Sequence, residues 1–70
     1  MNKIAISTEF IKLESAMKLA NCIETGGMAK AVIQDGFVSV NGEVCLMRGK
    51  KLYPGHTFTF AGQTYEICAK

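Results

Sequence analysis

The sequence predicts an α+β domain in which two short helices pack on a small, mainly antiparallel sheet of about four to five strands. Apolar residues recur at helical spacing between residues 13 and 33, and then alternate with polar ones at a period of two. An Asn-Gly pair and a Pro-Gly pair mark tight turns within the alternating part. With 70 residues the chain should form a single domain, residues 1–70, because so short a chain buries only about 60% of its unfolded surface.

The first third of the chain predicts an extended segment followed by a helix. Residues 4–11 are rich in β-branched and aromatic side chains, which favour an extended backbone. The helical spacing that follows predicts a first helix of about ten residues. Its apolar positions are Leu13, Ala16, Met17, Ala20 and Ile23.

A second, short helix is expected over residues 28–33, where apolar residues again follow helical spacing. The pair Gly26-Gly27 interrupts the helical pattern before it, and Thr25 can cap the new helix by accepting a backbone N–H bond. Gly36 then occupies the usual position of a helix stop.

Four short strands are expected after Gly36. Asn41-Gly42, between alternating apolar residues, is the strongest short signal for a type I′ hairpin turn. The segment 53–56, Tyr-Pro-Gly-His, predicts a type II turn, because proline presets φ and Gly55 accepts a positive φ. A last hairpin turns at Ala61-Gly62, with apolar positions at Phe58, Phe60, Tyr65 and Ile67.

Composition and cysteine spacing favour a compact cytoplasmic protein. The chain is 49% apolar and 20% charged, and no segment approaches the roughly 18 apolar residues that a membrane span needs. Cys22, Cys45 and Cys68 form no Cys-x-x-Cys pair and have only His56 as a possible nitrogen ligand. We therefore expect three reduced, mostly buried thiols, and neither a metal nor a cofactor.

Catalysis finds little support in the sequence. His56 stands alone in a Pro-Gly turn, where we expect it to be exposed and without a nucleophile as partner. The carboxylates are scattered singly along the chain, so no acid and base pair is indicated. We expect no enzymatic activity and no small-molecule substrate.

Positive charge is concentrated in one place, although the net charge is only +2. Arg48, Lys50 and Lys51 fall within four positions, and no acidic residue occurs between Val44 and Tyr65. A polyanion would relieve the repulsion among these cations. The alternative is an ordinary solvated loop.

The start of the second helix is another candidate site. Backbone N–H groups at a helix start favour anions, so Thr25, Gly26 and Gly27, with Lys30 one turn further on, could hold an RNA phosphate. The alternative is a plain capped connection between helices.

Base stacking on aromatic side chains is less favoured than recognition of the RNA backbone and shape. Phe58, Phe60 and Tyr65 have the pattern of core residues. The sequence assigns Phe10, Phe37 and Tyr53 neither to the core nor to the surface.

Three segments resemble, in order and spacing, the α-L RNA-binding motif of the ribosomal-protein S-four superfamily, over about residues 12–46. They are Lys12-Leu13-Glu14, Thr25-Gly26-Gly27-Met28-Ala29-Lys30-Ala31-Val32-Ile33 and Gly36-Phe37-Val38-Ser39-Val40-Asn41-Gly42. The continuation is similar to the stand-alone bacterial YbcJ-type subgroup, in Arg48-Gly49-Lys50-Lys51-Leu52-x-Pro54-Gly55 and Phe60-Ala61-Gly62.

The resemblance implies a non-catalytic, monomeric protein that binds structured RNA, either ribosomal or transfer RNA, on or near the ribosome during its assembly. By position it implies RNA contacts from Lys12, Thr25, Gly26, Gly27, Lys30, Arg48, Lys50 and Lys51. The alternative is a protein-interaction module of the same fold that docks on an acidic protein surface.

Two departures from the family pattern accompany the resemblance. Many members have Arg where Lys12 stands and Arg near Gly26, so this chain has point charges and backbone N–H groups in place of bidentate forks. His56 replaces an acidic residue that is common after the Pro-Gly turn.

Overall fold

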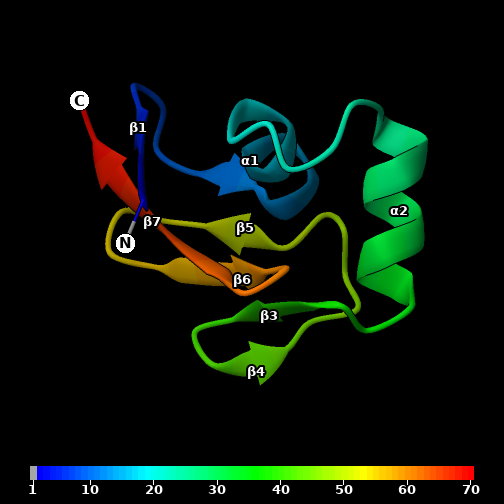
Figure 1. Cartoon of the computed structure of the whole chain (residues 1–70). Coiled ribbons are helices and arrows are strands. Elements are labelled where there is room, and N and C mark those ends of the chain that lie inside the picture. Colours follow the sequence, from blue (N-terminus) through cyan, green and yellow to red (C-terminus); the bar gives the residue numbers. More distant parts are fainter. Residues whose placement is uncertain (1) are drawn as a thin grey trace.

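Within residues 2–70, which the structure, a computed structural model, describes, the chain forms two helices and seven strands (Figure 1). They are β1 (Asn2–Ile6), β2 (Ile11–Lys12), α1 (Leu13–Leu19), α2 (Gly26–Gln34), β3 (Val38–Val40), β4 (Glu43–Val44), β5 (Lys51–Leu52), β6 (Thr57–Phe60) and β7 (Gln63–Ala69). The predicted α+β architecture, two helices with a mainly antiparallel sheet, is confirmed.

The strands form two sheets. The larger has the order β1-β7-β6-β3-β4, with β1 and β7 parallel and the other neighbours antiparallel. Strands β2 and β5 form a separate antiparallel ribbon of two residues each. The prediction of four strands after the helices was wrong because it missed β5. Two residues are too few to show an alternating pattern, and the partner strand lies far earlier in the sequence.

Helix α1 is shorter than predicted, ending at Leu19 rather than near Ile23. Asn21 has a φ of 59°, the left-handed conformation that asparagine tolerates better than most residues. The N–H of Cys22 donates to the carbonyl of Met17 at 2.9 Å, and the N–H of Asn21 to that of Lys18 at 3.1 Å. These two bonds form a Schellman motif that stops the helix. Ile23 is nevertheless buried, although it lies in the connection between α1 and α2.

Helix α2 begins two residues earlier than predicted, because Gly26 and Gly27 belong to its first turn. The predicted cap is confirmed, since Thr25 Oγ1 accepts the N–H of Met28 at 3.2 Å. Gly36, with a φ of 84°, ends the helix as expected.

The predicted turns also form. Asn41 and Gly42 have φ values of 51° and 87°, as a type I′ hairpin requires. Gly55 has a φ of 97°, and the N–H of His56 donates to the carbonyl of Tyr53 at 2.9 Å, as in a type II turn.

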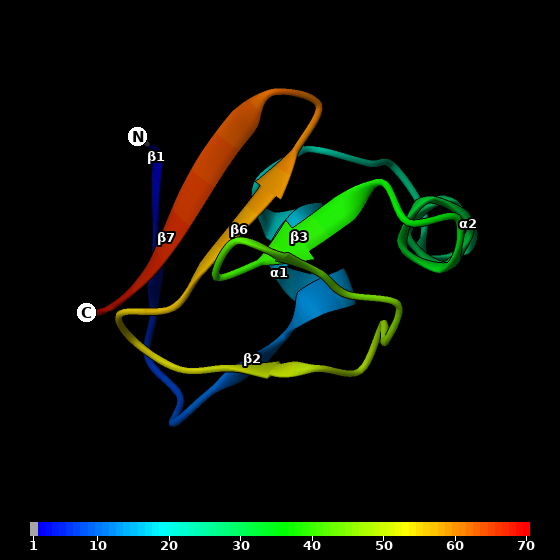
Figure 2. The same cartoon turned by 90° about the horizontal axis from the view of Figure 1, so that it is seen from below.

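Both helices, the sheet and the ribbon contribute to one hydrophobic core. The largest fully buried side chains are Phe58, Leu13, Met17, Ile33, Leu52, Ile67 and Val38. Seen from below (Figure 2), α1 lies behind β3, and α2 is viewed end-on beside it. Leu52 is the ribbon's anchor in this core, and its burial contributes roughly 2 kcal/mol. That anchor fixes the position of Lys51, which precedes it in β5.

Candidate nucleic-acid interface

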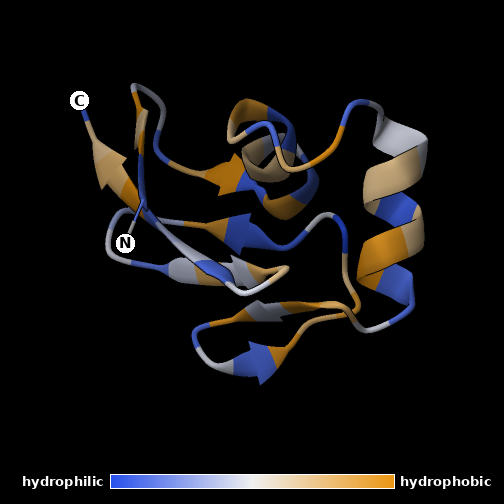
Figure 3. Ribbon diagram, viewed as in Figure 1, coloured by the Kyte–Doolittle hydropathy of each residue, from blue (hydrophilic) through white to orange (hydrophobic). Residues whose placement is uncertain are grey.

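The β2–β5 ribbon places two lysines directly opposite each other. Its register pairs Ile11 with Leu52 and Lys12 with Lys51. Leu52 is buried, whereas both lysines are exposed on the other face. Directly opposed residues of an antiparallel pair have Cβ atoms about 5 Å apart, and like charges at that spacing destabilise the pair. The segment around β5 is accordingly one of the hydrophilic parts of the chain (Figure 3).

The start of α1 fixes the loop before β5. The N–H of Leu13 donates to the carbonyl of Lys50 at 2.8 Å, and the N–H of Glu14 to that of Arg48 at 3.1 Å. The loop is closed by a further bond of 3.2 Å from the N–H of Lys50 to the carbonyl of Met47. The positive end of the α1 dipole therefore meets loop carbonyls instead of an external anion.

These bonds hold the loop carbonyls against the helix and leave the side chains of Arg48 and Lys50 exposed. The structure thus brings together four of the predicted residues from two distant parts of the sequence. We call Lys12, Arg48, Lys50 and Lys51 the basic cluster. Glu14, which is partly buried in the first turn of α1, is the carboxylate nearest to it in sequence.

An aromatic group adjoins the basic cluster on the outward face of the ribbon. The ammonium of Lys51 lies 4.9 Å from the centroid of the Phe10 ring, a cation–π geometry. The Phe10 and Tyr53 centroids are 5.8 Å apart at an interplanar angle of 46°. The His56 ring meets Tyr53 edge-on, also at 5.8 Å.

Sequence reasoning missed this group. Phe10 and Tyr53 each stand two positions from a ribbon lysine, and that period of two was the available signal. His56 was expected to be exposed, but it is partly buried, and its Nδ1 accepts the N–H of Tyr53 at 3.2 Å.

The start of α2 forms a second group, composed of Thr25, Gly26, Gly27 and Lys30, all exposed. A Cβ atom at Gly26 would meet nothing within 4 Å, and one at Gly27 only Thr25 Oγ1 at 3.9 Å. Neither glycine has a positive φ, so the fold itself does not require glycine at either position. The loop from β4 to β5 lies between β5 and α2 in both views (Figures 1 and 2).

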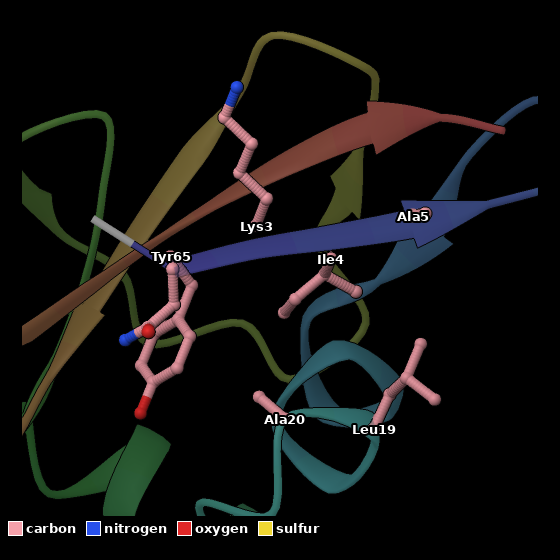
Figure 4. A pocket seen from close by; sticks show the side chains of 7 residues that line it. Lys3, Ile4, Ala5, Leu19, Ala20 and Tyr65 are labelled. Atoms are coloured by element: carbon pink, nitrogen blue, oxygen red, sulfur yellow. The ribbon is translucent and has the colours of Figure 1, made fainter.

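A pocket of about 480 Å³ lies elsewhere, between the first strand and the end of α1 (Figure 4). Tyr65 lines it together with Ile4, Leu19 and Ala20, while the Lys3 side chain points away from them. The neighbouring Cys22 side chain, together with burial, raises the pKa of Tyr65 above its ordinary value. The phenol is therefore held in its neutral form.

The thiols and carboxylates form no further centre. Cys22, Cys45 and Cys68 are unpaired, and each is partly rather than fully buried, which corrects the expectation of mostly buried thiols. In the part of the chain that the structure describes, three or more His, Cys, Asp or Glu side chains nowhere gather as metal ligands would. Neither helix of residues 2–70 is long and apolar enough to cross a membrane.

Comparison with known proteins identifies the family. The model of the S4 domain family matches residues 4–68. The "Probable ribosome maturation protein RlbA" of Bacillus subtilis (strain 168) is 44% identical over 61 residues, 87% of this chain and 86% of that protein. YbcJ of Escherichia coli (strain K12) is 34% identical over 59 residues, 84% of each chain.

The solution structure of Escherichia coli YbcJ, described as revealing an αL motif involved in RNA-binding, has the same fold. It superposes with a TM-score of 0.75 at 30% identity, covering 99% of this chain and 89% of YbcJ. The matched span includes both the ribbon and the start of α2. The chain therefore belongs to the S4 domain family, in its stand-alone YbcJ-type subgroup.

Proposed function

We propose that this protein binds structured RNA, without catalysis, through contacts between its basic cluster and RNA phosphates. The observation that carries the proposal is the direct opposition of Lys12 and Lys51, with Arg48 and Lys50 beside them. Bringing these cations together costs free energy in the unbound protein, and a row of phosphates would offset that cost.

The start of α2 supplies a second contact in this proposal. Its first turn contains no acidic residue, and Lys30 adds a positive charge one turn on. Because Gly26 and Gly27 have no side chain, an RNA backbone can approach their N–H groups closely. The start of α2 and the basic cluster would then bind the same RNA at two separate sites.

Ribosomal RNA during ribosome assembly is the proposed target. It is supported by the name of the Bacillus subtilis relative, a ribosome maturation protein, and by the αL motif described for YbcJ. Phosphate contacts position a protein on RNA but do not identify bases. We therefore expect weak sequence specificity and recognition mainly of RNA shape.

A second candidate function is docking on an acidic protein surface. A shallow groove of about 400 Å³ beside the basic cluster is lined in part by Val44, Leu46, Met47 and Lys50. The three apolar side chains among them are exposed, as is typical of a protein-binding surface. An acidic peptide with apolar residues would match both the groove and the adjoining charge.

The test is RNA binding over a series of salt concentrations, with purified protein and ribosomal RNA fragments. With three to six cations engaged, the slope of log affinity against log salt should be roughly −2 to −5. The triple variant Arg48→Ala, Lys50→Ala, Lys51→Ala should bind more weakly, with a slope reduced in magnitude by about two to three units.

The matched control is the triple variant Lys3→Ala, Lys18→Ala, Lys70→Ala, which removes the same charge from exposed positions elsewhere. It should bind nearly as well as the unchanged protein. Equal losses in both variants would mean that net charge, and not the basic cluster, drives binding. Absence of binding by the unchanged protein at low salt would favour the acidic protein surface.

A further inference from the structure

The outward face of the β2–β5 ribbon combines cations with an exposed ring. We infer that Tyr53 is a stacking site for one unpaired nucleobase of the RNA whose phosphates the basic cluster holds. This inference rests on the proposed function and narrows it, because it requires an RNA with an unpaired nucleotide next to the bound phosphates.

The first support is position. Lys51 and Tyr53 are two residues apart on one extended segment, with buried Leu52 between them. They therefore point to the same side, about 7 Å apart along the strand. A phosphate held by Lys51 would leave its neighbouring base within reach of the Tyr53 ring.

The second support is that the ring is held in place before any RNA binds. Tyr53 is 38% exposed, yet Phe10 packs against it and His56 meets it edge-on. Its N–H and carbonyl are both hydrogen-bonded to His56, at 3.2 Å and 2.9 Å. A ring fixed in this way loses little conformational freedom when a base stacks on it.

The third support is that the other aromatic rings are covered by another side chain or lie away from the ribbon. Lys51 lies over the Phe10 ring, and Phe58 is fully buried and stacked on Tyr65 with centroids 4.9 Å apart. Phe37 is 65% exposed, but it follows α2 and does not belong to the ribbon. Tyr53 thus has an exposed ring that lies close to the basic cluster. This inference departs from the expectation from sequence that base stacking is less favoured than recognition of the RNA backbone and shape.

The experiment compares two hairpin RNAs with the same stem and the same phosphates. One has a loop of ordinary nucleotides and the other a loop of abasic nucleotides. The unchanged protein should bind the first more tightly by roughly 5- to 150-fold, the usual effect of one stacked base. The variant Tyr53→Leu, which keeps apolar bulk without a planar ring, should bind both RNAs equally.

Two further variants separate stacking from folding. Tyr53→Phe keeps the ring and should retain the preference, whereas Phe37→Leu removes an exposed ring elsewhere and should change nothing. Because no cation is lost, Tyr53→Leu should keep the salt slope of the unchanged protein.

Fluorescence gives a direct test of contact with Tyr53. In a Tyr65→Phe background Tyr53 is the remaining tyrosine. The base-containing loop should quench its fluorescence, while the abasic loop should leave it unchanged.

The outcomes distinguish the two proposals. If the protein binds both hairpins equally, or if Tyr53→Leu retains the preference, stacking on Tyr53 is wrong while phosphate binding stands. If neither hairpin binds at low salt, the proposed RNA binding fails, and the stacking site with it.

Discussion

The Nδ1 atom of His56 accepts the backbone N–H of Tyr53 at 3.2 Å, joining the two ends of the turn that contains Pro54 and Gly55. The same turn is closed from the other side by the N–H of His56, which donates to the Tyr53 carbonyl. A carboxylate at position 56 could accept the same N–H. The turn can therefore be closed by histidine in place of the acidic residue that the resemblance predicts there.

Replacing His56 tests this relationship. His56→Ala removes the acceptor and should lower the free energy of unfolding by about 1 kcal/mol. His56→Asp restores an acceptor and should remain close to the unchanged protein. Urea denaturation of the three proteins measures the difference. An alanine variant as stable as the aspartate variant would show that the bond contributes nothing.

Reversing the charge of Lys12 should move stability and RNA binding in opposite directions. Lys12→Glu converts a like-charge pair with Lys51 into an attractive one, which should stabilise the fold by about 0.2–1 kcal/mol. RNA affinity should fall, because a phosphate contact becomes a repulsion. Thermal unfolding and salt-dependent RNA binding measure the two effects. Lys70→Glu, with the same change of net charge at an exposed position, should leave both nearly unchanged.

Replacing the glycines at the start of α2 should also raise stability while lowering RNA affinity. Gly26→Ala and Gly27→Ala add a Cβ without a clash, so each should raise stability by about 0.4–1 kcal/mol through a less flexible unfolded chain. Each should also weaken RNA binding several-fold, because the new methyl group holds a phosphate away from the backbone. Gln34→Ala, at the other end of the helix, is the control for binding. Unchanged RNA affinity in both glycine variants would remove the start of α2 from the interface.

Tyr65 should make stability depend on alkaline pH. Its raised pKa means that the unfolded chain gives up the phenolic proton first, so the stability it contributes is full below pH ~10 and is lost as the pH rises further. Unfolding free energies between pH 8 and 11 should therefore fall more steeply for the unchanged protein than for Tyr65→Phe. Cys22→Ala, which removes the neighbouring thiol, should lie between them. If unfolding free energy falls equally with pH in the unchanged protein and Tyr65→Phe, Tyr65 does not cause the alkaline loss of stability.

Features with local causes were predictable from the sequence. Thr25 caps the second helix, Gly36 ends it, and Asn41-Gly42 turns the hairpin, because each signal lies within four residues of the structure it specifies. The end of α1 was missed because Asn21 turns the chain while the apolar spacing continues to Ile23. Asparagine is a weaker stop signal than the glycine after α2.

Features that depend on distant pairing were not predictable in this way. The charge of residues 48–51 was visible, but that Lys12 lies opposite Lys51 depends on a ribbon joining distant parts of the chain. The resemblance had placed Lys12 among the RNA contacts without giving its neighbours. Tyr53 was left undecided for the same reason, since Phe10, which packs against its ring, comes beside it only when the ribbon forms.

The pairing of β1 with β7 has a consequence for synthesis. Ile4 lies beside Ile67, so strand β1 finds its partner in a strand that is made much later. The helices and the β3–β4 hairpin are contacts between near neighbours in the sequence and can form on a nascent chain, whereas β1 must wait until β7 has left the exit tunnel. Until then Ile4 and Ile6 lack their final partners, so the sheet is completed after the helices and the hairpin have formed.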